Sequence, residues 1–261
     1  RATTATLLRK PLSADRAVQI ALLNNRGLQA AYNELAIAEA RAVEGSLPPN
    51  PAISLSRIAG SVEIEIERKI VANVLALATL PMRSEIAATR FRQAQAIALA
   101  ETLRVAADAR RAFYRAVAAH EVASFLTRAQ GSARTSAEFA ARLGETGAMS
   151  KLDQAREQAF HAELTAQLAS ARQRAASARE ALVRSMGLWG DDLGFRIAGT
   201  LPRLPKHPQT LPGVEVEAVR RHVDLQVERL ELDALAKSYG LTQATRFINV
   251  LDAGFVSKTT R

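Results

Sequence analysis

The side chains best suited to chemistry in this sequence are its four histidines, because the chain has no cysteine. They lie in separate segments and lack the i, i+4 histidine pair of a helical zinc site. We therefore expect them to be surface or packing residues rather than metal ligands. They are His120, His161, His207 and His222. No phosphate-binding glycine loop, GxSxG motif or clustered triad accompanies them, so we predict no catalytic residue, no metal, no cofactor and no enzyme activity.

Three glutamates form the only other notable pattern of reactive groups. They alternate with apolar residues in Val62–Glu67, and a similar alternation runs through Ile53–Ser56, with a turn at Ala59–Ser61 between them. Each segment thus has one apolar and one polar face, which predicts a β-hairpin. The pattern suits an ordinary half-buried surface hairpin and, equally, a barrel with lipid outside and water inside. Carboxylates spaced in this way favour a water-facing wall over an acid/base pair. These residues are Glu63, Glu65 and Glu67.

Most of the chain has the pattern of long helices. Met82–Leu143 contains no proline and one glycine, and about 60 helical residues make a rod of roughly 90 Å that needs neighbouring helices along its length. A polar turn with two glycines follows at Gly144–Ser150, and Lys151–Met186 returns as a second helix, with Ser150 and Asp153 as its cap. The predicted fold is mainly α, a long antiparallel helical hairpin of the tunnel or coiled-coil type.

The flanking segments complete the predicted organisation. Helices capped by Ser13 precede the strands and break at Asn24–Gly27, and four prolines mark the connector after the hairpin, where we expect Trp189 to be a packing anchor. A shift of 197 residues aligns the segment after Val214 with the first helices, which predicts the opening of a second repeat. The predicted segments are 1–51 (N-terminal equatorial helices), 52–81 (strands), 82–187 (hairpin, tip near 144–150), 188–213 (connector) and 214–261 (helical start of a second repeat).

Composition and charge argue against two further possibilities, nucleic-acid binding and a membrane-spanning helix. The net charge is +9, but the 29 arginines are scattered among acidic residues without interleaved aromatics, which favours a solvated helical face over nucleic-acid binding. No apolar run approaches the roughly 20 residues of a membrane-spanning helix. The first ten residues contain neither an initiating Met nor an apolar signal core, so we expect any signal peptide to be absent from this chain.

Several motifs, in order, resemble the TolC family of outer-membrane efflux proteins. The resemblance extends over essentially the whole chain, although no single motif is a strong signature. The stretches that carry it are Pro11–Leu28, Leu47–Pro51, Gly147–Asp153, Gly187–Gly190 and Leu201–Pro205.

The resemblance implies a homotrimer whose strands form a shared outer-membrane β-barrel and whose helices form a periplasmic tunnel. Ile53–Arg57 and Val62–Lys69 would enter the barrel, with Glu63, Glu65 and Glu67 facing the lumen. Asp153 matches an acidic position that helps hold the tunnel entrance closed. The tip would contact a periplasmic adaptor through Gly144, Thr146, Gly147, Met149, Ser150 and Leu152.

The function that the resemblance implies is a passive duct for small molecules, working with the adaptor and an inner-membrane pump. Its location would be the cell outer membrane with a periplasmic helical part. The family has two strand–hairpin repeats, so we expect this sequence to be part of a longer protein. A soluble helical-hairpin scaffold or adaptor-like coiled coil is the alternative, and an arginine-rich nucleic-acid binder is a third.

Overall fold

The computed structural model describes residues 2–59, 64–197, 200–204, 206–207, 212–248 and 250–260. The chain divides into two compact units. The first, here called the hairpin unit, comprises Arg1–Gln29 and Glu101–Thr210. The second, the sheet unit, comprises Ala30–Ala100 and Leu211–Arg261.

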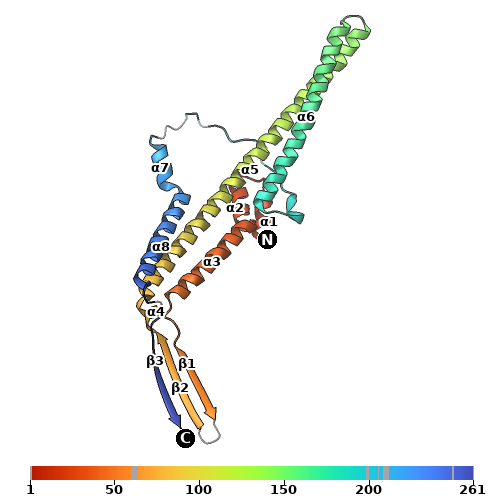
Figure 1. Cartoon of the computed structure of the whole chain (residues 1–261). Coiled ribbons are helices and arrows are strands. Elements are labelled where there is room, and N and C mark those ends of the chain that lie inside the picture. The colour runs from red at the N-terminus through yellow and green to blue at the C-terminus, as the bar shows by residue number, and fades with distance from the viewer. Residues whose placement is uncertain are drawn as a thin grey trace. The chain divides into compact units, whose positions relative to one another are not determined.

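The described residues are mainly helical, as predicted, with one small sheet (Figure 1). The helices are α1 (Ala2–Leu8), α2 (Ala14–Asn24), α3 (Arg26–Ser46), α4 (Val74–Ala78), α5 (Leu80–Glu145), α6 (Lys151–Met186), α7 (Val214–Arg221) and α8 (Val223–Thr245), with a 3-10 turn η1 at Gly190–Leu193. The strands are β1 (Ala52–Ala59), β2 (Ile64–Asn73) and β3 (Asp252–Thr260).

The hairpin unit is built on two antiparallel helices, the second part of α5 and all of α6, which lie side by side up to the tip (Figure 1). Gln130 on α5 contacts His161 on α6, with 2.9 Å between the amide nitrogen and Nε2. Gly187 ends α6 in the left-handed conformation, with φ of 67°, which glycine adopts without steric cost. A Cβ there would lie 2.6 Å from the carbonyl oxygen of Asn24, so glycine also permits close approach to the end of α2.

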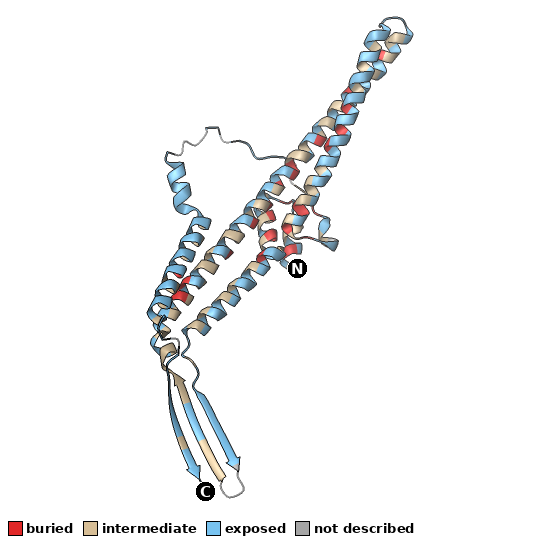
Figure 2. Ribbon diagram, in the orientation of Figure 1, coloured by how far each residue is buried: buried red, intermediate tan, exposed pale blue. Residues whose placement is uncertain are grey.

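The main core of this unit lies where α2, α5 and α6 meet (Figure 2). Large aliphatic side chains are fully enclosed there, while alanines allow the helices to approach closely. Its buried members are Leu12, Ala17, Ile20, Phe113, Ala116, Val117, Leu182, Val183, Met186, Leu188 and Phe195. A second group along α5 consists of Ala21, Leu28, Val105 and Ala109.

Arg179 on α6 binds the start of the connector. Its Nη2 donates to the carbonyl oxygens of Leu193 and Phe195, at 2.8 and 2.9 Å, and its guanidinium lies 4.3 Å above the Phe195 ring. The prediction that Trp189 is a packing anchor is wrong, because its side chain is 61% exposed. The neighbouring Leu188 and Phe195 are instead the buried members of the core in this segment.

The sheet unit contains a three-stranded antiparallel sheet in the order β1-β2-β3. The hairpin of β1 and β2 agrees with the predicted alternation, whereas its turn at 60–63 lies outside the described residues. The prediction that 214–261 is the helical start of a second repeat is wrong for its last part, where Asp252–Thr260 forms β3. Because β3 pairs along most of β2, its strand conformation comes from that long-range pairing rather than from a local pattern.

The predicted internal repeat is visible in the backbone. Asn25 separates α2 from α3 with φ −68° and ψ 116°, and His222, 197 positions later, separates α7 from α8 with φ −65° and ψ 115°. The amides of Gln29 and Gln226 then donate to the carbonyl oxygens of these two residues. The same break in the same phase supports two copies of one helical unit.

Helix α5 begins at Leu80, slightly before the predicted start near Met82. Pro81 therefore lies within its first turn instead of before it. Proline is tolerated there, because the first amides of a helix have no intrahelical acceptor in any case.

Candidate functional sites at the helical tip and on the sheet

The turn at the helical tip is shaped by Gly147. Its φ is 73°, and the amides of Gly147 and Ala148 donate to the carbonyl oxygens of Gly144 and Leu143 at 3.1 and 2.8 Å. This pair of hydrogen bonds satisfies the carbonyls at the end of α5 and closes the helix tightly. Thr146 adds a third, from its hydroxyl to the carbonyl oxygen of Leu143 at 2.9 Å. The tip is therefore a compact, ordered turn.

Ser150 and Asp153 form the predicted cap of α6. Ser150 Oγ accepts from the amide of Asp153 at 3.2 Å and donates to Asp153 Oδ2 at 2.7 Å. The other carboxylate oxygen accepts from Arg156 Nη1 at 3.3 Å. A carboxylate in the first turn is also favoured by the helix dipole. Asp153 is thus held in place within its own helix while its side chain stays exposed.

Gln154 completes the tip, although no sequence pattern indicates this role. Its Nε2 donates to the carbonyl oxygen of Met149 at 3.1 Å. A Cβ on Gly144 would lie 2.1 Å from that nitrogen, so glycine at 144 leaves the space that Gln154 occupies. The structure brings the six predicted contact residues together around this turn, with Leu152 largely exposed and Met149 half-buried.

On the sheet, Glu65 and Glu67 lie on one face, as predicted, and Glu63 lies outside the described residues. Lys258 on β3 stands directly opposite Glu67. Its Nζ lies 3.1 Å from Glu65 Oε1 and 3.6 Å from Glu67 Oε2. This lysine was missed because β3 itself was not predicted.

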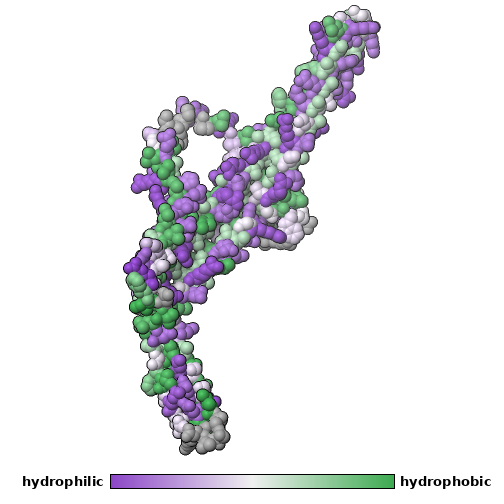
Figure 3. Space-filling view, viewed as in Figure 1, coloured by the Kyte–Doolittle hydropathy of each residue, from purple (hydrophilic) through white to green (hydrophobic). Residues whose placement is uncertain are grey.

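The opposite face of the sheet is largely apolar. The register places Ile53, Ile70 and Phe255 in one row across the three strands, and all three side chains are about half exposed or more. Arg57 and Arg68 interrupt this face nearer the other end of the strands. Hydrophobic residues reach the surface of the sheet in the space-filling view (Figure 3).

Within the ranges given above, no group of three or more His, Cys, Asp or Glu side chains could hold a metal ion. Among those same residues, no helix is both long and apolar enough to cross a membrane.

Comparisons with known proteins show the fold. No family model matches the chain, and no curated protein matches it. Solved structures do: CusC, described in connection with transmembrane channel formation, has a TM-score of 0.77 at 16% identity, covering 95% of this chain and 60% of that one. The CmeC outer membrane channel of Campylobacter jejuni has a TM-score of 0.75 at 14% identity, covering 95% and 61%. The outer membrane protein VceC of Vibrio cholerae has 0.71 at 14%, covering 95% and 67%.

These structures define the class of fold. The chain has the TolC-type fold of outer-membrane channels, so the fold predicted from the motifs is confirmed. It spans about 60% of the length of the first matching structures.

Proposed function

We propose that this chain is part of an outer-membrane channel that serves as a passive duct for small molecules in a tripartite efflux system. The observation that carries the proposal is the likeness to outer-membrane channels over 95% of the chain. The proposed assembly is a homotrimer that works with a periplasmic adaptor and an inner-membrane pump. Its strands lie in the outer membrane and its helices in the periplasm, and it catalyses no reaction. The likeness favours this function over a soluble scaffold or a nucleic-acid binder.

The tip is the proposed contact for the adaptor. Its backbone is fixed by the hydrogen bonds around Gly147 and by the Ser150 cap, so Thr146 and Leu152 are presented to solvent with little freedom to lose on binding. A small ordered turn with one exposed leucine suits docking against another helical hairpin. Asp153, exposed on the first turn of α6, is the proposed gate residue.

The polar face of the sheet is the proposed lining of the lumen. Glu65 and Glu67 share this face with Lys69 and Lys258, whereas the other face carries the row of exposed apolar residues. A sheet with one charged and one apolar face suits a wall between water and lipid. Glu63 belongs to the same proposed lining by its alternation in the sequence.

One experiment in cells tests both the duct and the tip. The gene that carries this chain is deleted, restored on a plasmid with its natural flanking sequence, and assayed for accumulation of a fluorescent dye and for co-purification of the adaptor. We expect deletion to raise dye accumulation and Gly147→Val to raise it nearly as far, because a branched side chain disfavours the left-handed turn and adds bulk at the contact. The amount of adaptor that co-purifies with the Gly147→Val variant should fall as well.

Gly190→Val is the matched control. Gly190 also has a positive φ, of 68°, and open space around it, but it lies outside the tip. The Gly190→Val variant also places a branched residue in the left-handed conformation. It should nevertheless restore efflux and adaptor recovery. Equal adaptor recovery with Gly147→Val would refute the tip assignment, and unchanged dye accumulation after deletion would refute the duct.

A further inference from the structure

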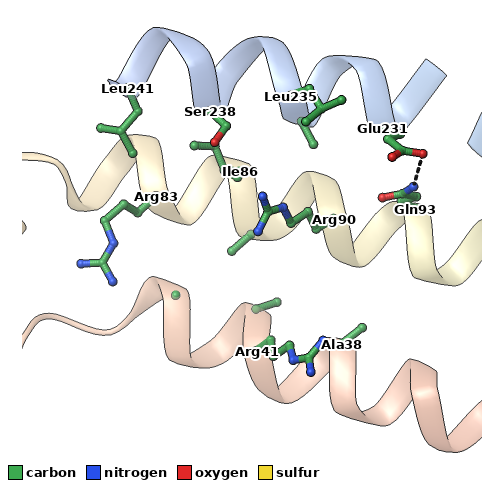
Figure 4. Close-up of a pocket in the computed structure, with 14 residues that line it drawn as sticks. Ala38, Arg41, Arg83, Ile86, Arg90, Gln93, Glu231, Leu235, Ser238 and Leu241 are labelled. Atoms are coloured by element: carbon green, nitrogen blue, oxygen red, sulfur yellow. Dashed lines mark hydrogen bonds between the residues drawn. The ribbon is translucent and has the colours of Figure 1, made fainter. Parts of the chain in front are cut away.

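The sheet unit contains a cavity of about 550 Å³ between α3, the first part of α5 and α8 (Figure 4). In this view Leu235, Ser238 and Leu241 project from α8 toward α5. Arg41 lies on α3, and Arg83 and Arg90 lie on α5. The proposed function makes no use of this cavity.

The cavity has an apolar base. Ile86 on α5 and Ala234 on α8 are buried there. A Cβ on Gly45 would lie 2.9 Å from the Cβ of Ala87, so glycine lets α3 approach α5 closely at one end of the cavity. The alanines Ala38 and Ala42 continue this small-residue wall along α3. An apolar group can therefore lie against the base without displacing a polar side chain.

The wall formed by α8 is held in place by Lys237. Its Nζ lies 2.9 Å from Glu85 Oε1 on α5, 2.8 Å from Asp233 Oδ2 and 3.2 Å from the hydroxyl of the buried Thr89. Hydrogen bonds to Asp233 and Glu85 raise the pKa of Lys237. Because the carboxylates of Glu85 and Asp233 neutralise this lysine, Lys237 adds no net positive charge around the cavity.

The remaining charge around the cavity is positive and unpaired. Within the part of the chain that the structure describes, the guanidinium groups of Arg41, Arg83 and Arg90 have no hydrogen-bond or ion-pair partner. One carboxylate lines the cavity, that of Glu231, and its Oε2 accepts from Gln93 Nε2 at 3.5 Å. Three arginines against one glutamate give a positive potential over an apolar base.

We propose that this cavity binds an amphiphilic anion, a small molecule with an apolar body and one sulfonate, carboxylate or phosphate group. The volume lies within the roughly 300–1,000 Å³ typical of small-molecule sites. Guanidinium groups are suited to oxyanions because their planar donors match the spacing of the anion's oxygens. A soluble aromatic acid and an anionic lipid share this chemistry.

Binding of naphthalene-2-sulfonate to the purified chain, held in a non-ionic amphipathic polymer, tests the proposal by calorimetry. Naphthalene-2-methanol has the same apolar body without the charge, and inorganic sulfate has the charge without the body. We expect the sulfonate to bind at least about tenfold more tightly than either. Equal binding of the neutral alcohol would overturn the proposal, because the arginines would then contribute nothing.

Substitutions of the three arginines test whether the sulfonate binds in this cavity. Arg41→Gln, Arg83→Gln and Arg90→Gln combined should weaken sulfonate binding about tenfold, since charge pairs that remain in contact with water contribute modestly. The control combines Arg57→Gln, Arg220→Gln and Arg229→Gln, which removes the same charge from exposed positions of the same unit outside the cavity. An equal loss in the control would show attraction by bulk charge alone and would overturn the site.

A charge-preserving variant distinguishes loss of the positive charges from misfolding. Arg41→Lys, Arg83→Lys and Arg90→Lys combined should bind the sulfonate within a few-fold of the unmodified chain, and failure to do so with an intact circular dichroism spectrum would contradict the electrostatic argument. Displacement of the probe by dihexanoylphosphatidylglycerol would identify anionic lipid as an occupant. Binding of the sulfonate without such displacement supports a soluble anion.

Discussion

Large apolar side chains are buried in the core of the hairpin unit but exposed in the sheet. Leu12, Ile20 and Leu182 are fully buried where α2, α5 and α6 meet. Ile53 and Phe255 in the sheet are 76% and 70% exposed. The hairpin core encloses its apolar residues within one chain, whereas the sheet presents a row of them outward.

The difference follows from how each element presents its side chains. Three helices can surround a common axis, so residues three and four apart on each helix meet in the middle. A single sheet layer has two faces, and one stays uncovered unless another layer packs on it. Under the proposed function the uncovered apolar face of the sheet is the side that meets lipid.

A matched pair of leucine substitutions measures this contrast, and we expect the largest effect from it. Leu182→Ala should lower the free energy of unfolding by about 2–5 kcal/mol, because it leaves a cavity in a closed core. Leu55→Ala, at a side chain that is 73% exposed, should change it by less than about 0.5 kcal/mol. Urea unfolding followed by circular dichroism provides both values. Similar losses at the two positions would mean that the apolar face of the sheet is covered in solution.

A pair of glycines tests the backbone in the same two regions. Gly187→Ala should cost about 3 kcal/mol, since it combines a left-handed residue with a Cβ that lies 2.6 Å from the carbonyl oxygen of Asn24. Gly254→Ala on β3 requires no positive φ, and its nearest neighbour is the carbonyl oxygen of Ile70 at 3.0 Å. A shift of this strand by a few tenths of an ångström relieves that contact, so we expect a change below about 1 kcal/mol. Thermal unfolding of both variants checks the order, which a larger loss at Gly254 would reverse.

The hairpin was predictable because its signals are local. Absence of proline over Met82–Leu143, glycines at the turn and Ser150 three residues before Asp153 each indicate a helix or its end. The break at Asn24–Gly27 was predictable for the same reason, and its copy at His222 appears with nearly identical dihedral angles. The placement of the six tip residues around one turn follows from these helix ends.

The parts that were missed depend on contacts between distant residues. Asp252–Thr260 has no strict alternation and becomes a strand by pairing with β2. Lys258 beside Glu67 follows only from that register. Gln154 gives no signal by itself, because its role depends on the space above Gly144. The cavity between α3, α5 and α8 likewise combines residues that are about 200 positions apart.

The ion pairs of Lys258 give the smallest expected effect, and salt separates it from packing. Its Nζ lies 3.1 Å from Glu65 Oε1 and 3.6 Å from Glu67 Oε2 on an exposed face, so these pairs add little stability and are screened by salt. Lys258→Met should therefore lower the urea midpoint slightly at low salt, and the difference from the unmodified chain should shrink in about 1 M salt. Lys69→Met, on the same face without an ion pair among the described residues, should show no such salt dependence. A midpoint difference that persists unchanged at high salt would mean that Lys258 acts through packing of its aliphatic stem, and the polar face would then resemble the apolar face in depending on contact rather than on charge.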